Sequence, residues 1–121
     1  MLFRSLAGLH EKQDRLADAE AMYKEALRIK ELKLGHESLD VATTLNNLAG
    51  LHQKQDRLAD AEAMYKEALR IRELKLGHES LDVASTLNNL AGLHQEQDRL
   101  ADAEAMYKEA LRILELKLGH E

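Results

Sequence analysis

Histidine is the residue type in this chain that is best able to carry chemistry, because it is both the commonest metal ligand and a proton carrier near neutral pH. Its six copies recur every 42 residues as two sets, at positions 10, 52 and 94 and at positions 36, 78 and 120. Equivalent positions in stacked helix pairs lie on the order of 10 Å apart, whereas zinc needs ligands at about 2 Å. We therefore expect His10, His52 and His94 to pack in or near the core, and the second set to be solvated.

The remaining polar residues form no catalytic constellation. Carboxylates such as Asp60 and Glu67 are interleaved with Lys66 and Arg70, which is typical of a solvated, charge-mixed helix face. The sequence contains no cysteine and no glycine-rich phosphate loop. We predict a protein that is not an enzyme and that binds no cofactor and no metal.

Asparagine pairs offer binding chemistry instead. Asn46 and Asn47 recur 42 residues later as Asn88 and Asn89. Each amide carries donors and an acceptor, so a row of amides on successive helices would hold the backbone of an extended peptide without reading its side chains.

An internal repeat of 42 residues positions all of these groups. Tyr23, Tyr65 and Tyr107 mark its period. The first two copies differ at seven places, five of them within residues 1–5, and the last two copies differ at positions 43/85, 54/96 and 72/114. Such near-identity indicates either recent duplication or deliberate construction from a consensus. A period of this length predicts a solenoid, which we divide into repeats 1–37, 38–79 and 80–121 of a single domain.

Each repeat is predicted to contain two helices. In the middle repeat Ser38 is the expected N-cap of a helix from Leu39 to about Lys54, and Asp56 stands where the chain adopts a left-handed conformation. A second helix is expected from Leu58 to Leu76, with Gly77 as its C-cap. Three repeats predict an all-α fold of six antiparallel helices in three pairs.

The second helix of each repeat carries an apolar stripe that is too broad for one pair to bury. A neighbouring pair must therefore cover it, which is the logic of a stacked array. In the middle repeat the stripe comprises Leu58, Ala61, Met64, Tyr65, Ala68, Leu69, Ile71 and Leu76.

Composition excludes several classes of protein. A net charge of −5 argues against a protein that tracks nucleic-acid phosphates. No apolar run approaches the roughly 20 residues that span a bilayer. The absence of cysteine favours a reducing compartment, so we predict a cytoplasmic protein with neither a nucleic-acid nor a membrane partner.

Residues 45–71, "LNNLAGLHQKQDRLADAEAMYKEALRI", resemble a tetratricopeptide repeat (TPR), and the length resembles the 42-residue variety of kinesin light chains. The matching positions are Leu48, Ala49, Ala61, Tyr65 and Ala68. Departures are Asp56 in place of the turn glycine, Leu39 in place of the first-turn proline and His52 in place of the aromatic residue of the first helix. The resemblance implies a right-handed α-α superhelix without enzyme activity, whose first helices line a groove for a peptide or partner protein.

The face of the first helices opposite the core is polar and largely uncharged, and it would line that groove. The expected groove residues are Thr43, Asn46, Asn47, Gly50, Gln53, Lys54, Asn88, Asn89 and Gly92, with Arg4 at the open end. Two alternatives remain open at this stage. The amides either meet a ligand or bond to solvent and a neighbouring helix, and Gly50 serves either helix packing or ligand access.

A second hypothesis is self-association through the terminal helices. Leu114 replaces the basic residue of the earlier copies, and Leu118 adds apolar surface beside it. Leu2 and Phe3 are equally apolar at the other end. The ends would associate head to tail or by exchange of terminal helices. A third hypothesis is an array fragment that has no ligand of its own.

Overall fold

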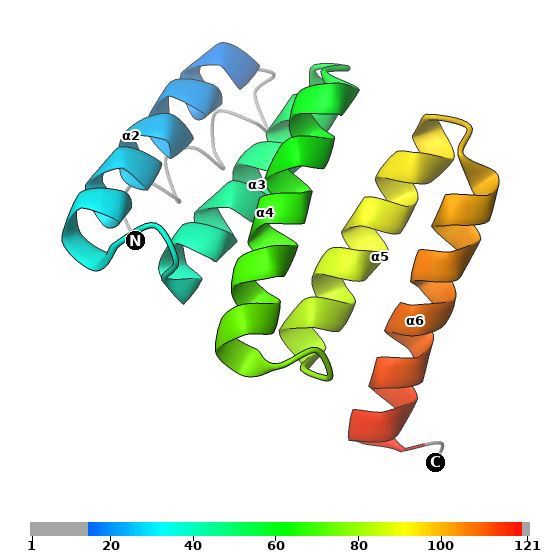
Figure 1. Ribbon diagram of the computed structural model, residues 1–121. Coiled ribbons are helices and arrows are strands. Elements are labelled where there is room, and N and C mark those ends of the chain that lie inside the picture. The colour runs from blue at the N-terminus through cyan, green and yellow to red at the C-terminus, as the bar shows by residue number, and fades with distance from the viewer. Residues whose placement is uncertain (1–14, 120–121) are drawn as a thin grey trace.

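The computed structural model describes residues 15–119, and these residues form helices without any strand (Figure 1). In chain order the helices are α2 (Leu16–Leu34), α3 (Leu39–Lys54), α4 (Leu58–Leu76), α5 (Leu81–Glu96) and α6 (Leu100–Leu118). The all-α prediction is confirmed, and the two helices expected for the middle repeat have the predicted bounds. The first of the six expected helices falls within residues 1–14, outside the described part of the chain.

The helices stack as antiparallel pairs. We call α3 and α5 the A helices, and α2, α4 and α6 the B helices. Contacts are densest within the pairs α3–α4 and α5–α6, and successive pairs meet through α2–α3 and α4–α5. Each A helix therefore packs on its own B helix and also on the B helix before it. Helix α6 ends the row at the C-terminal edge (Figure 1).

Local residue chemistry accounts for the helix ends. The Ser38 hydroxyl accepts a hydrogen bond from the N–H of Val41 at 3.1 Å, which satisfies one of the free donors of the first turn of α3. Gly77 ends α4 with a φ of 86°, and Asp56 turns the chain between α3 and α4 with a φ of 60°. Both predicted positions are confirmed.

The core is built both within the helix pairs and at the junctions between repeats. Tyr65 and Ala61 of α4 form one buried cluster with Leu90 and Leu93 of α5. Alanine lets the two helices approach closely, and each buried leucine contributes roughly 1.5–3 kcal/mol. The predicted stripe is wrong at Leu76, whose side chain is exposed. The B helices have 19 residues and the A helices 16, so the last turn of a B helix extends past its neighbours.

The two described histidines of the first set, His52 and His94, are buried as predicted. The Nδ1 atom of His52 lies 3.1 Å from Oε1 of Gln55, and His94 has the same relation to Gln97 at 3.0 Å. These contacts join each A helix to the turn that follows it. His10 lies outside the described residues.

His78 lies at the surface, as expected, and it also makes a contact between repeats that was not expected. Its side chain is exposed, yet Nδ1 lies 2.6 Å from a Glu73 carboxylate oxygen and Nε2 lies 2.6 Å from one of Glu109. A neutral imidazole has one N–H, so hydrogen bonds to both carboxylates require the imidazolium. In its imidazolium form His78 ties the end of α4 to α6.

Within residues 15–119 none of the helices is long and apolar enough to cross a bilayer.

Replacing Ser80, the N-cap of α5, with alanine should lower the free energy of unfolding by about 1 kcal/mol, because the N–H of Val83 loses its acceptor. Chemical denaturation monitored by circular dichroism measures this change. Ser85→Ala is the matched control, since Ser85 is exposed on the same helix and alanine favours a helix. Equal destabilisation by the two variants would contradict the capping role.

Stability should also depend on pH through His78. The Glu109 and Glu73 carboxylates raise the pKa of His78, so its stabilising effect is complete below the unfolded-state pKa of about 6.5 and is lost as the pH rises through the raised pKa. The pKa of Glu109 is lowered to about 2, first by Arg112 and then by His78, so its own contribution is present above about 4.5 and is lost as the pH falls toward about 2.

We therefore expect the difference in unfolding free energy between the wild type and His78→Gln to shrink as the pH is raised from about 6 to about 9. Denaturant titrations at several pH values measure it. Glu25→Gln is the control, because Glu25 pairs with Arg28 rather than with a histidine. A difference that stays constant over this range would show that His78 does not act as a cation.

Candidate functional site

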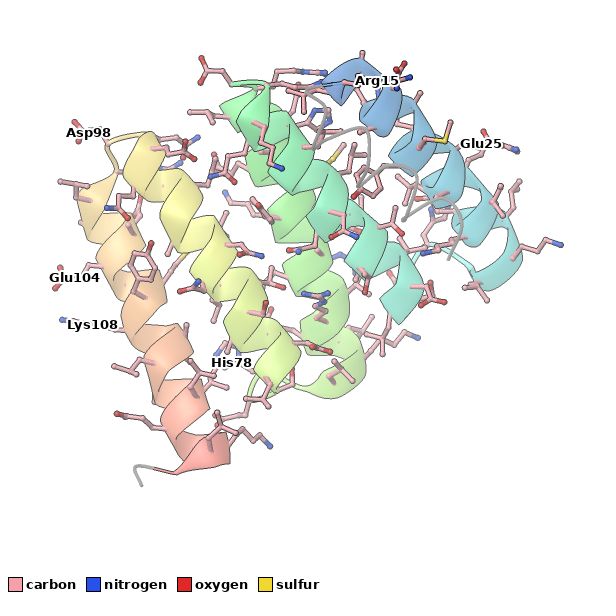
Figure 2. The ribbon with its side chains drawn as sticks, turned by 180° about the vertical axis from the view of Figure 1, so that it is seen from behind. Arg15, Glu25, His78, Asp98, Glu104 and Lys108 are labelled. Atoms are coloured by element: carbon pink, nitrogen blue, oxygen red, sulfur yellow. The ribbon has the colours of Figure 1, made fainter. Side chains whose placement is uncertain are left out.

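The candidate site is the outward side of the A helices, which we call the A-helix face. Figure 2 shows the molecule from behind, with α3 now in front of α4 and α5 beside it. Among the described residues the face comprises Thr43, Asn46, Asn47, Gly50 and Gln53 of α3 and Ser85, Asn88, Asn89, Gly92 and Gln95 of α5. It contains no charged side chain.

One hydrogen bond joins the two A helices across this face. The Nδ2 atom of Asn89 donates to Oδ1 of Asn46 at 3.2 Å. The alternative in which an asparagine bonds to a neighbouring helix therefore holds for this pair. Asn47 and Asn88 differ, because their side chains make no hydrogen bond within residues 15–119. Asn88 is exposed and Asn47 is half-buried.

A tyrosine–glutamine contact borders the amide pair at the C-terminal end of the A helices. The Tyr65 hydroxyl donates to Oε1 of Gln53 at 3.0 Å, and Nε2 of Gln53 in turn donates to Glu96 of the next repeat. Burial, followed by the Glu96 charge, raises the pKa of Tyr65 and keeps it protonated as a donor. Tyr107 donates to Gln95 in the same way at 3.1 Å. Sequence reasoning missed these hydroxyls because the tyrosines belong to the B helices.

The glycines of this face lie over those hydroxyls. A Cβ atom added at Gly50 would be 3.6 Å from the Tyr65 hydroxyl oxygen, and one at Gly92 would be 3.7 Å from that of Tyr107. Both distances are ordinary van der Waals contacts, so among the described residues alanine fits at either position. Helix packing therefore does not require glycine here.

The N-terminal end of the A-helix face lies beside a buried cation. The Arg72 guanidinium donates to the Thr86 hydroxyl at 2.6 Å and to the Thr43 hydroxyl at 3.4 Å. Burial lowers the pKa of Arg72. Thr43 also donates to the carbonyl of Leu39, so its hydroxyl is held within the fold.

The remaining predicted site residues are spread more widely. Lys54 is exposed at the end of α3. Leu114 and Leu118 are exposed on α6, where sequence reasoning missed the neighbouring Leu100, Tyr107 and Leu111. Arg4, Leu2 and Phe3 lie outside the described residues.

Ion pairs dominate the other surfaces. Glu62 of α4 accepts from Lys66 and from Arg99 of the next repeat, and its pKa is lowered to about 2, first by Lys66. Glu20 of α2 has the same arrangement with Lys24 and Arg57. The turns and B helices thus present paired charges, whereas the A-helix face presents neutral amides.

Solved structures with the same architecture include the crystal structure of BtubC (BKLC) from P. vanneervenii, at 34% identity and a TM-score of 0.85, over 92% of this chain and 44% of that one. A Podosopora anserina protein described as a candidate kinesin light chain with nearly identical TPR-like repeats matches at 16% identity and a TM-score of 0.84, over 93% and 53%. The chain therefore spans about half the length of these proteins. No curated protein matches it.

The sequence profile of the family described as Tetratricopeptide repeat matches residues 1–74 and again residues 40–115. Together those two matches cover residues 1–115, which is most of the chain. The chain therefore belongs to the tetratricopeptide repeat family.

Proposed function

We propose that this chain is a non-enzymatic scaffold that holds an extended peptide, or an extended segment of a partner protein, across the A-helix face. Its family and fold are those of repeat scaffolds, which typically mediate protein–protein interaction. The observation that carries the finer proposal is the difference between the amides. Asn46 and Asn89 bond to each other, while Asn47 and Asn88 have no partner within residues 15–119.

The chemistry of the face supports a ligand that is recognised through its backbone. An amide can donate to a peptide carbonyl and accept from a peptide N–H at the same time. The Asn46–Asn89 bond holds the helices at a set spacing, which lowers the entropy lost when a ligand binds. A face without charged side chains gives little preference for acidic or basic peptides.

A cytoplasmic location and the absence of nucleic-acid partners belong to the same proposal. The net charge of −5 and the lack of cysteine support them. An array without any ligand of its own is the competing hypothesis.

The double variant Asn47→Ala, Asn88→Ala should bind peptides selected by the wild-type protein about tenfold more weakly, since each lost hydrogen bond costs about 0.5–1.5 kcal/mol. A peptide-library screen followed by calorimetry measures this. Lys108→Ala, at an exposed position of α6, is the control and should bind as the wild type does. Peptides that bind the double variant equally well would refute recognition by these amides. A screen that returns no peptide would favour the array without a ligand.

The glycines provide an independent test. Gly50→Ala and Gly92→Ala should each stabilise the fold by roughly 0.5–1 kcal/mol, because the added methyl group fits and alanine favours a helix. If a peptide backbone lies close to these positions, the same variants should bind it more weakly although they are more stable. Thermal denaturation and calorimetry on the same samples separate the two effects. Unchanged affinity would contradict a close approach of the ligand.

A further inference from the structure

The last B helix has an apolar face that its counterparts bury. Helices α4 and α6 have the same sequence apart from one residue, and in α4 this face is covered by Leu90 and Leu93 of α5. Tyr65 of α4 is therefore 4% exposed, whereas the equivalent Tyr107 is 38% exposed. Leu100, Leu111 and Leu114 are exposed beside it. The α4–α5 contact thus shows what kind of helix surface fits the face of α6.

A polar pair marks each internal junction. Lys30 donates to the Thr44 hydroxyl at 3.0 Å where α2 meets α3, and Arg72 donates to the Thr86 hydroxyl at 2.6 Å where α4 meets α5. In both cases a basic residue of a B helix meets a threonine of the following A helix. We call residues that are separated by the 42-residue period register mates. The register mate of Lys30 and Arg72 on α6 is Leu114.

The register mate of Thr44 and Thr86 near the start of the chain is Leu2. Both members of the polar pair are thus leucine at positions 2 and 114, so these two positions match each other in a contact between two copies of the chain. Leu6 and Leu9 occupy the register of Leu90 and Leu93, so the apolar part of the contact is kept. We infer that residues 1–14 of a second copy of this chain dock on α6 and continue the stack.

Charge complementarity supports the same contact. Glu20 accepts from Arg57 at 3.2 Å, and Glu62 accepts from Arg99 at 3.1 Å, each time across a junction between repeats. The register mate of Glu62 on α6 is Glu104, which is exposed and pairs within its own helix with Lys108. The register mate of Arg99 is Arg15, at the other end of the described chain. Figure 2 labels Arg15 and Glu104 on opposite sides of the molecule, as a head-to-tail contact requires.

This contact pairs two different surfaces, so it is heterologous and runs head to tail. Arginine at position 114 would place its charge against Leu2 without the threonine hydroxyl that Arg72 meets, whereas leucine at position 114 suits Leu2. A single helix face offers a small interface, so weak, concentration-dependent association is expected. It is independent of the A-helix face.

Sedimentation velocity of the full chain from about 10 µM to about 1 mM tests the inference. The wild-type sedimentation coefficient should rise with concentration, and Leu114→Arg should weaken association at least about tenfold. Leu116→Arg is the matched control. Leu116 is 60% exposed. The equivalent residue of α4, Leu74, is 59% exposed even though the helix pair α5–α6 packs against α4. This position therefore faces away from the contact. A wild type that stays monomeric throughout, or equal loss in the control, would overturn the inference.

A mixing experiment separates head-to-tail association from pairing of α6 with itself. Leu114→Arg blocks the tail and Leu2→Arg blocks the head, so each variant alone should be monomeric and their mixture should form a one-to-one dimer that grows no further. Circular dichroism of each variant checks that it is folded. Self-association of folded Leu2→Arg would overturn the inference in favour of an α6–α6 contact.

Discussion

The structure depends on one constraint, which is that a B helix cannot bury its apolar face within its own repeat. Tyr65 is covered only because Leu90 and Leu93 come from the next repeat, and its equivalent Tyr107 is largely exposed where the described chain ends. Stability therefore depends on the junctions as well as on the helix pairs. The same constraint keeps successive A helices side by side, which is what brings Asn46 within hydrogen-bonding distance of Asn89.

Helix ends could be predicted from the sequence because they depend on single residues acting locally. Ser38 supplies an acceptor, Gly77 supplies a positive φ, and Asp56 adopts the left-handed turn in place of the usual glycine. The extent of the core was less predictable. Periodicity placed Leu76 on the apolar stripe, but burial there depends on the different lengths of the A and B helices, which is a property of the assembled stack.

The candidate site was predictable as a face and not as a set of contacts. The helical wheel correctly put the asparagines opposite the core, while the bond between Asn46 and Asn89 links positions 43 residues apart, one more than the repeat period. That offset is set by how one A helix is displaced against the next, which the sequence does not reveal. The contact between His78 and Glu109 also depends on how successive repeats are placed, because Glu109 lies on the B helix of the following repeat. The sequence did not predict it.

Two of the three differences between copies two and three coincide with contacts between repeats. The third, at position 43, lies within a repeat, because the Thr43 hydroxyl accepts from Arg72 of its own repeat. The same guanidinium also donates to Thr86 of the next repeat. At position 96, glutamate replaces the lysine of position 54 and accepts from Gln53 of the preceding repeat. At position 114, leucine replaces the equivalent Arg72, whose guanidinium donates to Thr86 at the α4–α5 junction. Residues within a repeat can be copied unchanged, because their partners are copied with them. Residues at a junction are constrained by a partner in another repeat, so a change there alters which surfaces can meet.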